Sequence, residues 1–396
     1  MGWLGLDDTD HLDGGCTTHT LFQLIKELPP QYVVRSQRLV RLYPFAKQRT
    51  RGNAAVAIEI EGEDYTDLLA FLEAWWWEKI APLKGNLTQS KTYHRQQSPT
   101  DPGMVWFEQQ PSEEVYWNSV REEISIDDLP NADKSWGGHG RIGATAAISW
   151  PAERYTFEAI SWRTKESVKA GKPREVDLLR LSELDSDPNT FMSRDLRSKS
   201  ILISPRGNCP VLFGIRARTE SSAINGCKYL LESKITEPVE GFMVFQTNQA
   251  TDDHLGSNSI GTVNEIEIKQ RGTVKIICED ESILMAFAES GDIKNLAQWL
   301  KRGDQIEFNG LNSDDQTIHL ERLKVLSATP DKIRPKCPEC GATMKSMGKD
   351  QDLRCPKCKL RSPNTWQEIA RIPPFTNWVQ PPNDSMRHLA KPIYWS

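Results

Sequence analysis

The pattern of hydrophobic and polar residues over the first 259 positions predicts alternating strands and helices. Residues 2–6 form a short apolar strand, and apolar residues then recur at helical spacing from Thr17 to Leu28. Alternating apolar residues predict a strand around 56–60, and the helix predicted over 66–79 contains three tryptophans, 75–77, which we expect to pack inside. The other expected elements are a loop-rich stretch at 81–136, strands near 200–204 and 241–247, and a helix near 219–232. This part of the chain therefore predicts a compact α/β body.

From about residue 258 the pattern changes to short strands at close spacing. Strands are expected at 259–268, 272–279, 282–289, 304–310 and 316–325, with a helix near 292–301. Five strands with one helix between the third and the fourth match the order of an OB-fold. OB-folds bind single-stranded nucleic acid, although some mediate only protein contacts, and the RNA interpretation is favoured here.

Four of the eight cysteines form two close pairs near the C-terminus. Cys337 and Cys340, and then Cys355 and Cys358, have CxxC spacing, with 14 residues between the pairs. Each CxxC turn offers two thiolates, and four thiolates form the tetrahedron that Zn²⁺ prefers. Gly341 follows the first pair, where a tight knuckle needs a permissive backbone. A redox dithiol would need only one pair in a thioredoxin-like context, so we predict a zinc ribbon in a reducing cytosol.

The net charge of −5 does not by itself indicate a nucleic-acid partner, but its distribution does. Residues 331–396 carry 12 Lys and Arg against 6 Asp and Glu, whereas residues 1–259 carry 29 against 36. A basic end on an acidic body fits RNA held at one end, with random variation among domains as the alternative. The apolar stretches are too short for a membrane span, and the acidic N-terminus is unlike a signal peptide.

A loop directly after the first strand contains Asp7, Asp8 and Asp10. Clustered carboxylates at the carboxyl end of a buried strand invite Mg²⁺, which prefers oxygen ligands and bridges to substrate phosphates. These three aspartates are therefore candidates for catalysis and for binding Mg²⁺.

Candidates for phosphate binding follow at the start of the next helix. Gly14 and Gly15 let a phosphate approach the chain, and the helix start at Thr17 and Thr18 offers free N–H groups. Together with the aspartates, these residues resemble the parts of a phosphoryl-transfer site. The alternative is an acidic turn that caps a helix, because Asp and Thr are ordinary capping residues, and spacing alone does not decide between them.

A second glycine loop, 138–143, matches GxGxxG. No strand is expected before it, and Arg163 stands where a dinucleotide site would need an acidic residue. Gly140, Arg141 and Gly143 remain candidates for contacts with phosphate or RNA. Further polar candidates for substrate or RNA contacts are Arg51, Asn53, Arg216, Asn248 and Asp252.

Taken together, these motifs resemble the archaeal 2-agmatinylcytidine synthetases, which modify the isoleucine tRNA with a CAU anticodon. The resemblance covers nearly the whole chain and rests on residues 5–10 (GLDDTD), 16–18 (CTT), 50–53 (TRGN), 140–144 (GRIGA), 209–216, 247–254, the OB-fold pattern, the CxxC pairs and 388–392 (HLAKP). The expected organisation is an α/β body at 1–257 with a kinase-like ATP-binding part and a ferredoxin-like part, an OB-fold at 258–328, a zinc ribbon at 331–363 and a tail at 364–396.

The resemblance also implies a reaction and its partners. Such an enzyme phosphorylates the C2 carbonyl oxygen of the wobble cytidine with ATP, and the amine of agmatine then displaces the phosphate, so that the tRNA reads AUA. AMP and phosphate are the implied final products. The three aspartates would hold Mg²⁺ and the triphosphate, and Thr18 matches a threonine that the family is thought to autophosphorylate. The implied partners are agmatine and the anticodon region of that tRNA, in the cytoplasm, with no membrane or protein partner.

Two other functions stay open when the residues are considered alone. A haloacid-dehalogenase-type phosphatase needs DxDx[TV] after its first strand, but the run from Asp8 to Leu12 ends in leucine. A non-catalytic single-strand-binding protein, built on the OB-fold and the zinc ribbon, would leave the aspartate loop without a role.

Overall fold

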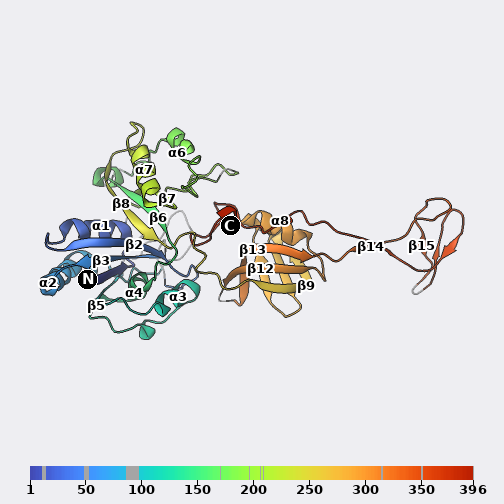
Figure 1. The fold of residues 1–396 in the computed structure, drawn as a ribbon, viewed down its shortest axis with the longest axis horizontal. Coiled ribbons are helices and arrows are strands. Elements are labelled where there is room, and N and C mark those ends of the chain that lie inside the picture. The colour runs from blue at the N-terminus through green and yellow to red at the C-terminus, as the bar shows by residue number, and fades with distance from the viewer. Residues whose placement is uncertain are drawn as a thin grey trace. The chain divides into compact units, whose positions relative to one another are not determined.

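The computed structural model describes the chain in two compact units. The described residues are 1–10, 15–48, 53–85, 98–169, 171–195, 197–205, 207, 209–313, 315–348 and 351–395. Met1–Gly256 and Pro382–Ser396 form the first unit, an α/β body, and Ser257–Pro381 form the second, which contains a β-barrel and a ribbon (Figure 1). Among the described residues, no helix is both long enough and apolar enough to cross a membrane.

In the described part of the body, eight strands form one mixed sheet in the order β5-β4-β1-β3-β2-β8-β6-β7. Only β2 and β8, among these neighbours, run parallel to each other. The strands are β1 (Gly2–Asp7), β2 (Val33–Arg41), β3 (Ala54–Glu61), β4 (Gly103–Phe107), β5 (Lys134–Gly137), β6 (Thr156–Arg163), β7 (Val211–Ala217) and β8 (Val239–Thr247). One sheet therefore runs through the whole body.

Helices cover the sheet because its strands are apolar on both faces. In β1, Leu4 and Leu6 pack into one core cluster with α1 and α2, whereas Trp3 packs into a second cluster with α3 and α4. A further cluster joins α6 and α7 to β6 and β7. The helices are α1 (Thr17–Glu27), α2 (Thr66–Trp75), α3 (Glu114–Arg121), α4 (Arg141–Ser149), α5 (Lys165–Lys169), α6 (Leu178–Leu184) and α7 (Glu220–Leu231).

The stretch at 81–136 differs from the loop-rich segment expected from its composition. It contains β4, whose five residues are all buried, then α3, and finally β5, which directly precedes the second glycine loop. The expectation that no strand precedes that loop was therefore wrong. Polar segments surround these short elements, and a five-residue buried strand is too short to show a period.

Two local expectations also differ from the structure. Trp75 and Trp76 are buried as expected, but Trp77 is 63% exposed. Residues 200–204 contribute an isolated bridge between Arg194 and Ile201 rather than a strand. The strand of that region is β7, which begins after Pro210.

The second unit contains the barrel that the sequence predicted. Within the described residues, five strands close in the order β10-β11-β13-β12-β9, and α8 (Asp292–Trp299) lies between the third and fourth of them along the chain. These strands are β9 (Ser259–Ile268), β10 (Val274–Cys278), β11 (Ile283–Ala286), β12 (Gln305–Asn312) and β13 (Thr317–Ser327). This order confirms the OB-fold and, with the ribbon, the predicted fold class.

The ribbon segment has two small sheets. β14 (Asp331–Ile333) pairs with β18 (Gln367–Ile369), and β16 (Leu353–Arg354) pairs on its two sides with β15 (Lys345–Ser346) and β17 (Arg361–Ser362). The predicted hairpin between the cysteine pairs is thus present as β15 and β16.

After the second unit the chain returns to the body through its last residues. The backbone N–H groups of Ala250 and Asp252 donate to the carbonyls of His388 and Leu389, each at 2.9 Å. The Leu389 side chain is 3% exposed and belongs to the core cluster of α3 and α4. The C-terminal segment, defined here as residues 382–395, is therefore a structural part of the body.

We expect Leu389→Ala to lower the free energy of unfolding of the body by about 2–4 kcal/mol, because it leaves a cavity in a packed core. Urea unfolding followed by tryptophan fluorescence measures this change. Leu179→Ala is a matched control, since Leu179 is 75% exposed, and its effect should stay near 0.5 kcal/mol. Equal, small effects of both substitutions would show that the C-terminal segment does not stabilise the body.

Candidate active site

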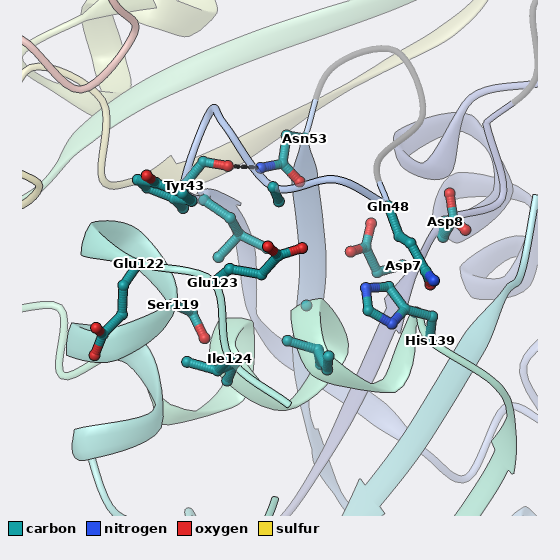
Figure 2. A pocket seen from close by; sticks show the side chains of 15 residues that line it. Asp7, Asp8, Tyr43, Gln48, Asn53, Ser119, Glu122, Glu123, Ile124 and His139 are labelled. Carbon is teal, nitrogen blue, oxygen red and sulfur yellow. Dashed lines mark hydrogen bonds between the residues drawn. The ribbon is translucent and has the colours of Figure 1, made fainter. Parts of the chain in front are cut away.

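A pocket lies where β1 ends, beside the start of α4, the end of α3 and the segment that follows β2 (Figure 2). Its lining residues are Asp7, Asp8, Leu42, Tyr43, Ala46, Gln48, Asn53, Ser119, Glu122, Glu123, Ile124, His139, Gly140, Ile142 and Gly143. The pocket therefore contains two of the three predicted aspartates and the two candidate glycines of the second glycine loop.

The glycines bring α4 directly onto the carboxyl end of β1. A Cβ atom on Gly143 would lie 1.9 Å from Oδ2 of Asp7, and one on Gly140 would lie 2.4 Å from the backbone nitrogen of Gly103. Any larger residue would separate the helix from the strand. In this structure, the glycines of the GxGxxG sequence serve close packing around Asp7.

The surroundings of Asp7 disfavour a negative charge on its carboxyl group. Desolvation by the surrounding protein, followed by the charges of Asp8 and Asp10, raises the pKa of its carboxyl group well above the usual range. A cation beside the carboxylate would offset both effects. Asp7 could therefore serve as one ligand of a metal ion in this pocket.

Asp8 and Asp10 are oriented by different contacts. Asp8 adopts a left-handed backbone, with φ of 57°, and its Oδ2 accepts the backbone N–H of Asp101 at 2.7 Å. Oδ1 of Asp10 accepts the backbone N–H of Thr17 at 2.5 Å and the Thr17 hydroxyl at 3.0 Å. The capping alternative thus describes Asp10, whereas Asp7 and Asp8 line the pocket.

Thr18 is buried at the start of α1. Its Oγ1 lies 3.1 Å from Sγ of Cys16 and accepts the indole N–H of Trp162 at 3.4 Å. Trp162 belongs to β6, so Thr18 lies at the contact between the first and the second half of the body. Gly15 is also described, whereas Gly14 lies outside the described residues.

Three further candidates from the sequence belong to segments at or beside the pocket. Asn53 lines it, and its Nδ2 donates to the carbonyl of Tyr43. Arg141 opens α4, and its Nε donates to the carbonyl of Gly138 at 3.3 Å. Arg51, the remaining candidate of this group, lies outside the described residues.

Three candidates lie away from the pocket lining. Arg216 is buried on β7, where its Nε lies 3.5 Å from Oε1 of Glu158. The Asn248 side chain accepts the backbone N–H of Arg41 and donates to the carbonyl of Arg41, at 2.8 and 2.9 Å. Oδ1 of Asp252 accepts the backbone N–H of Lys391 at 2.7 Å. Asn248 and Asp252 therefore support the body structurally.

The sequence did not point to several polar side chains of the pocket. These are Gln48, Ser119, Glu122, Glu123 and His139. Figure 2 shows the Glu123 carboxylate directed toward the middle of the pocket and Glu122 directed away from it. Glu122 and Glu123 follow α3 directly and belong to no recognisable sequence motif. Because the surrounding residues were expected to form a loop, the sequence did not indicate that this acidic pair lines a pocket.

The four paired cysteines form a metal site. Their sulfur atoms all lie within 4.8 Å of one another, and within the described ranges no other group of three or more His, Cys, Asp and Glu side chains gathers so closely. The separations of 3.4 Å (Cys337–Cys358, Cys340–Cys355) and 3.8 Å (Cys340–Cys358) are close to the ~3.8 Å expected for a tetrahedron with bonds of about 2.3 Å to Zn²⁺.

The two cysteine turns have the same backbone form. Gly341 and Lys359 follow the two pairs with φ of 70° and 68°, and each donates its N–H to the carbonyl of the first cysteine of its pair. The expectation for Gly341 is thus confirmed, and Lys359 adopts the same left-handed conformation without the freedom of glycine.

The fold and its sites define a class of multidomain protein, in which an α/β body with an acidic pocket is joined to an OB barrel and a zinc ribbon. Family profiles match the body and the ribbon: the TiaS TCKD domain over residues 3–139, the TiaS FLD domain over 138–254 and the TiaS C-terminal zinc ribbon domain over 334–373. The chain belongs to the TiaS family of tRNA 2-agmatinylcytidine synthetases, as its motifs predicted.

Relatives that carry the name of this family match along almost the whole chain. The protein from Methanocaldococcus jannaschii is 31% identical, over 99% of this chain and 98% of its own. The protein from Methanocorpusculum labreanum is 30% identical, over 98% and 95%.

Solved structures give the same match. A crystal structure of apo TiaS has a TM-score of 0.79 at 25% identity, and one of TiaS in complex with an isoleucine tRNA and ATP has 0.81 at 26%. Each comparison covers 100% of this chain and 97% of the other.

We expect Cys355→Ser to remove zinc and unfold the ribbon while the body and the barrel stay folded. The ribbon core is only a few side chains, so bound metal must supply its folding free energy, on the order of 10 kcal/mol. Zinc content measured with a chromogenic chelator, and limited proteolysis mapped to 334–373, test this. Cys278→Ser, at a buried cysteine of the barrel, should retain zinc. A Cys355→Ser protein with full zinc content would exclude the four-cysteine site.

Proposed function

We propose that this chain joins agmatine to C2 of the wobble cytidine in the CAU anticodon of an isoleucine tRNA, using ATP. The match to 2-agmatinylcytidine synthetases over the whole chain, together with the acidic pocket at the end of β1, carries this proposal. A similar protein was solved with an isoleucine tRNA and ATP, and one of the same fold was solved with that tRNA, AMPCPP and agmatine. Neither a phosphatase nor a non-catalytic binding protein is favoured by these relatives.

The triphosphate of ATP would bind at the pocket with Mg²⁺. Asp7 and Asp8 are the carboxylates that the pocket offers at the end of β1, and Mg²⁺ is usually held by one or two carboxylates together with water and substrate phosphates. The raised pKa of Asp7 fits this role, because a desolvated carboxylate is stabilised by a cation. A bound Mg²⁺ would supply charge neutralisation for phosphoryl transfer.

The chemistry requires a better leaving group at C2 of cytidine. Transfer of the terminal phosphoryl group of ATP to the C2 oxygen forms a P–O bond there and breaks the bond between the β- and γ-phosphates, which leaves ADP. Transfer of a second phosphoryl group from ADP, to Thr18 or to water, would give the AMP that the family resemblance implies. The primary amine of agmatine then attacks C2 and loses a proton, and the C2–O bond breaks with release of inorganic phosphate. The cytidine must leave its base stack to reach the pocket.

Besides the C2 oxygen of the cytidine, the hydroxyl of Thr18 is expected to accept a phosphoryl group. The family resemblance implies that it becomes phosphorylated, and its hydroxyl lies at the start of α1, where backbone N–H groups favour phosphate. Cys16 and Trp162 fix the position of that hydroxyl. Autophosphorylation of Thr18 therefore belongs to the proposal.

The barrel and the ribbon would hold the tRNA. The ribbon carries exposed basic side chains and Trp366, which stacks with Arg334 at 5.5 Å between the guanidinium carbon and the ring centroid. Such groups suit contacts with a phosphate backbone and with exposed bases. A reaction on tRNA with ATP and agmatine would take place in the cytoplasm.

We expect Asp8→Asn to reduce ATP turnover and agmatine incorporation at least a hundredfold, or about 2.7 kcal/mol in activation free energy. The amide keeps the shape of the side chain but removes a negative ligand of Mg²⁺. Release of AMP, together with transfer of labelled agmatine to a tRNA transcript, measures both activities.

The matched control for Asp8→Asn is Asp67→Asn, because Asp67 is exposed in the first turn of α2. This control should keep normal activity, and both variants should bind the tRNA as the native protein does. Normal ATP turnover by Asp8→Asn would place the catalytic site elsewhere.

Replacing the wobble cytidine with uridine should abolish incorporation of labelled agmatine. Uridine lacks the exocyclic amine of cytidine, and a site that hydrogen-bonds such a group typically rejects analogues that leave its partner unpaired. Comparison of the two transcripts at equal concentration tests this. Equal labelling would contradict base-specific recognition without contradicting agmatine transfer.

A further inference from the structure

The C-terminal segment reaches a buried polar network that crosses the sheet of the body. Gln249 lies at its centre and is fully buried. Nε2 of Gln249 donates to Oε2 of Glu158 at 2.5 Å, and its Oε1 lies 3.2 Å from Nδ1 of His388. Because the carboxylate of Glu158 can only accept, the amide oxygen of Gln249 faces the imidazole. Nδ1 of His388 therefore carries the proton and donates it to Gln249.

Glu158 connects this chain of contacts to two arginines. Its Oε1 lies 3.5 Å from Nε of Arg216, directly across from it on β7, and its Oε2 lies 3.7 Å from a terminal nitrogen of Arg41. A Cβ atom on Gly214 would come within 2.5 Å of Oε1, so glycine at that position leaves the room that Glu158 needs. Two guanidinium groups thus share one carboxylate.

The arginines give this cluster an excess of positive charge. Arg41 ends β2, and the charge of Asp10, whose carboxylate accepts the backbone N–H of Thr17, acts on its guanidinium, so the cluster lies near the start of α1. A pair of guanidinium groups with one carboxylate between them is suited to bind an oxyanion such as a phosphoryl group.

The imidazole of His388 does not add to that charge. Although the residue is exposed at the surface, the positive charge of Arg41, then desolvation, then the charge of Arg216 lower the pKa of His388 well below its usual range. A neutral imidazole with a proton on Nδ1 is a hydrogen-bond donor to Gln249 and no competitor for the anion. Its other nitrogen is not needed for this contact.

We propose that His388 is a positioning residue of the agmatine-transfer reaction, which through Gln249 and Glu158 orients Arg41 and Arg216 to hold a phosphoryl group of the reactants. The proposal rests on the proposed function and adds an anion-binding pair to it. The C-terminal segment thereby contributes to the reaction as well as to the stability of the body.

The test compares His388→Ala and His388→Asn in the full-length, zinc-loaded protein. The amide N–H of asparagine can replace the Nδ1–H of histidine toward Gln249, whereas alanine leaves Gln249 without a donor. We expect His388→Ala to lower kcat for agmatine incorporation about thirtyfold, because a small misplacement of binding groups costs one to two orders of magnitude. His388→Asn should restore kcat to within about threefold of the native value, and tRNA affinity should be unchanged in both.

Two controls separate positioning from a loss of fold. Asp384→Asn changes an exposed side chain of the same segment and should leave kcat and KM at native values. In a Gln249→Leu background, His388→Ala should add little further loss, because both substitutions interrupt the same chain of contacts. Urea unfolding of each variant checks that it is folded at the assay temperature.

Three results would overturn the inference: native kcat in His388→Ala, equal loss in the alanine and asparagine variants, or additive effects of His388→Ala and Gln249→Leu. Equal loss would show that the imidazole acts through its other nitrogen. If the native protein transfers no agmatine, the proposed function falls and the inference with it. If it does transfer agmatine and His388→Ala is as active, only the inference falls.

Discussion

The site depends on the close contact of α4 with β1. A Cβ atom on Gly5 would lie 2.3 Å from the carbonyl oxygen of Ala144, and one on Gly143 would lie 1.9 Å from the carboxylate of Asp7. Helix and strand can approach this closely only with glycine at both positions, one on each element. Because the start of α4 is fixed there, Asp7 is enclosed at the end of its strand, and the pocket forms between that end and α3. A larger residue at Gly143 would displace the carboxylate of Asp7, and one at Gly5 would push α4 away from the strand.

The enclosure of Asp7 has an electrostatic consequence. Its carboxyl group is desolvated and lies beside Asp8, and both effects raise its pKa well above the usual range. A triphosphate alone would be repelled by these carboxylates, whereas its complex with Mg²⁺ would be attracted. If ATP binds here as proposed, these carboxylates would favour its Mg²⁺ complex over the free triphosphate.

The sequence predicted those features that depend on neighbouring residues. Helical spacing indicated α1, strand order indicated the barrel, and CxxC spacing indicated the metal site. It did not predict β4 or α3, whose elements are short and surrounded by polar residues, and so it could not indicate Glu123. The three aspartates were expected to act together, but only the structure separates Asp10, which caps α1, from the two that line the pocket. The contact between Gln249 and His388 spans 139 positions, and no local pattern could indicate such a pairing.

The contact between Gln249 and His388 also has a consequence for how the chain folds, because the two residues lie on opposite sides of the second unit in the sequence. The body is interrupted after Gly256 by the barrel and the ribbon, and it is completed by the segment from Pro382 onward. Leu389 fills its core, and His388 reaches the network of Glu158 only after the whole second unit has been synthesised. A chain that stops before the ribbon would therefore lack part of the α/β body as well as the ribbon itself. The connectivity of the chain therefore makes completion of the α/β body depend on synthesis of the second unit.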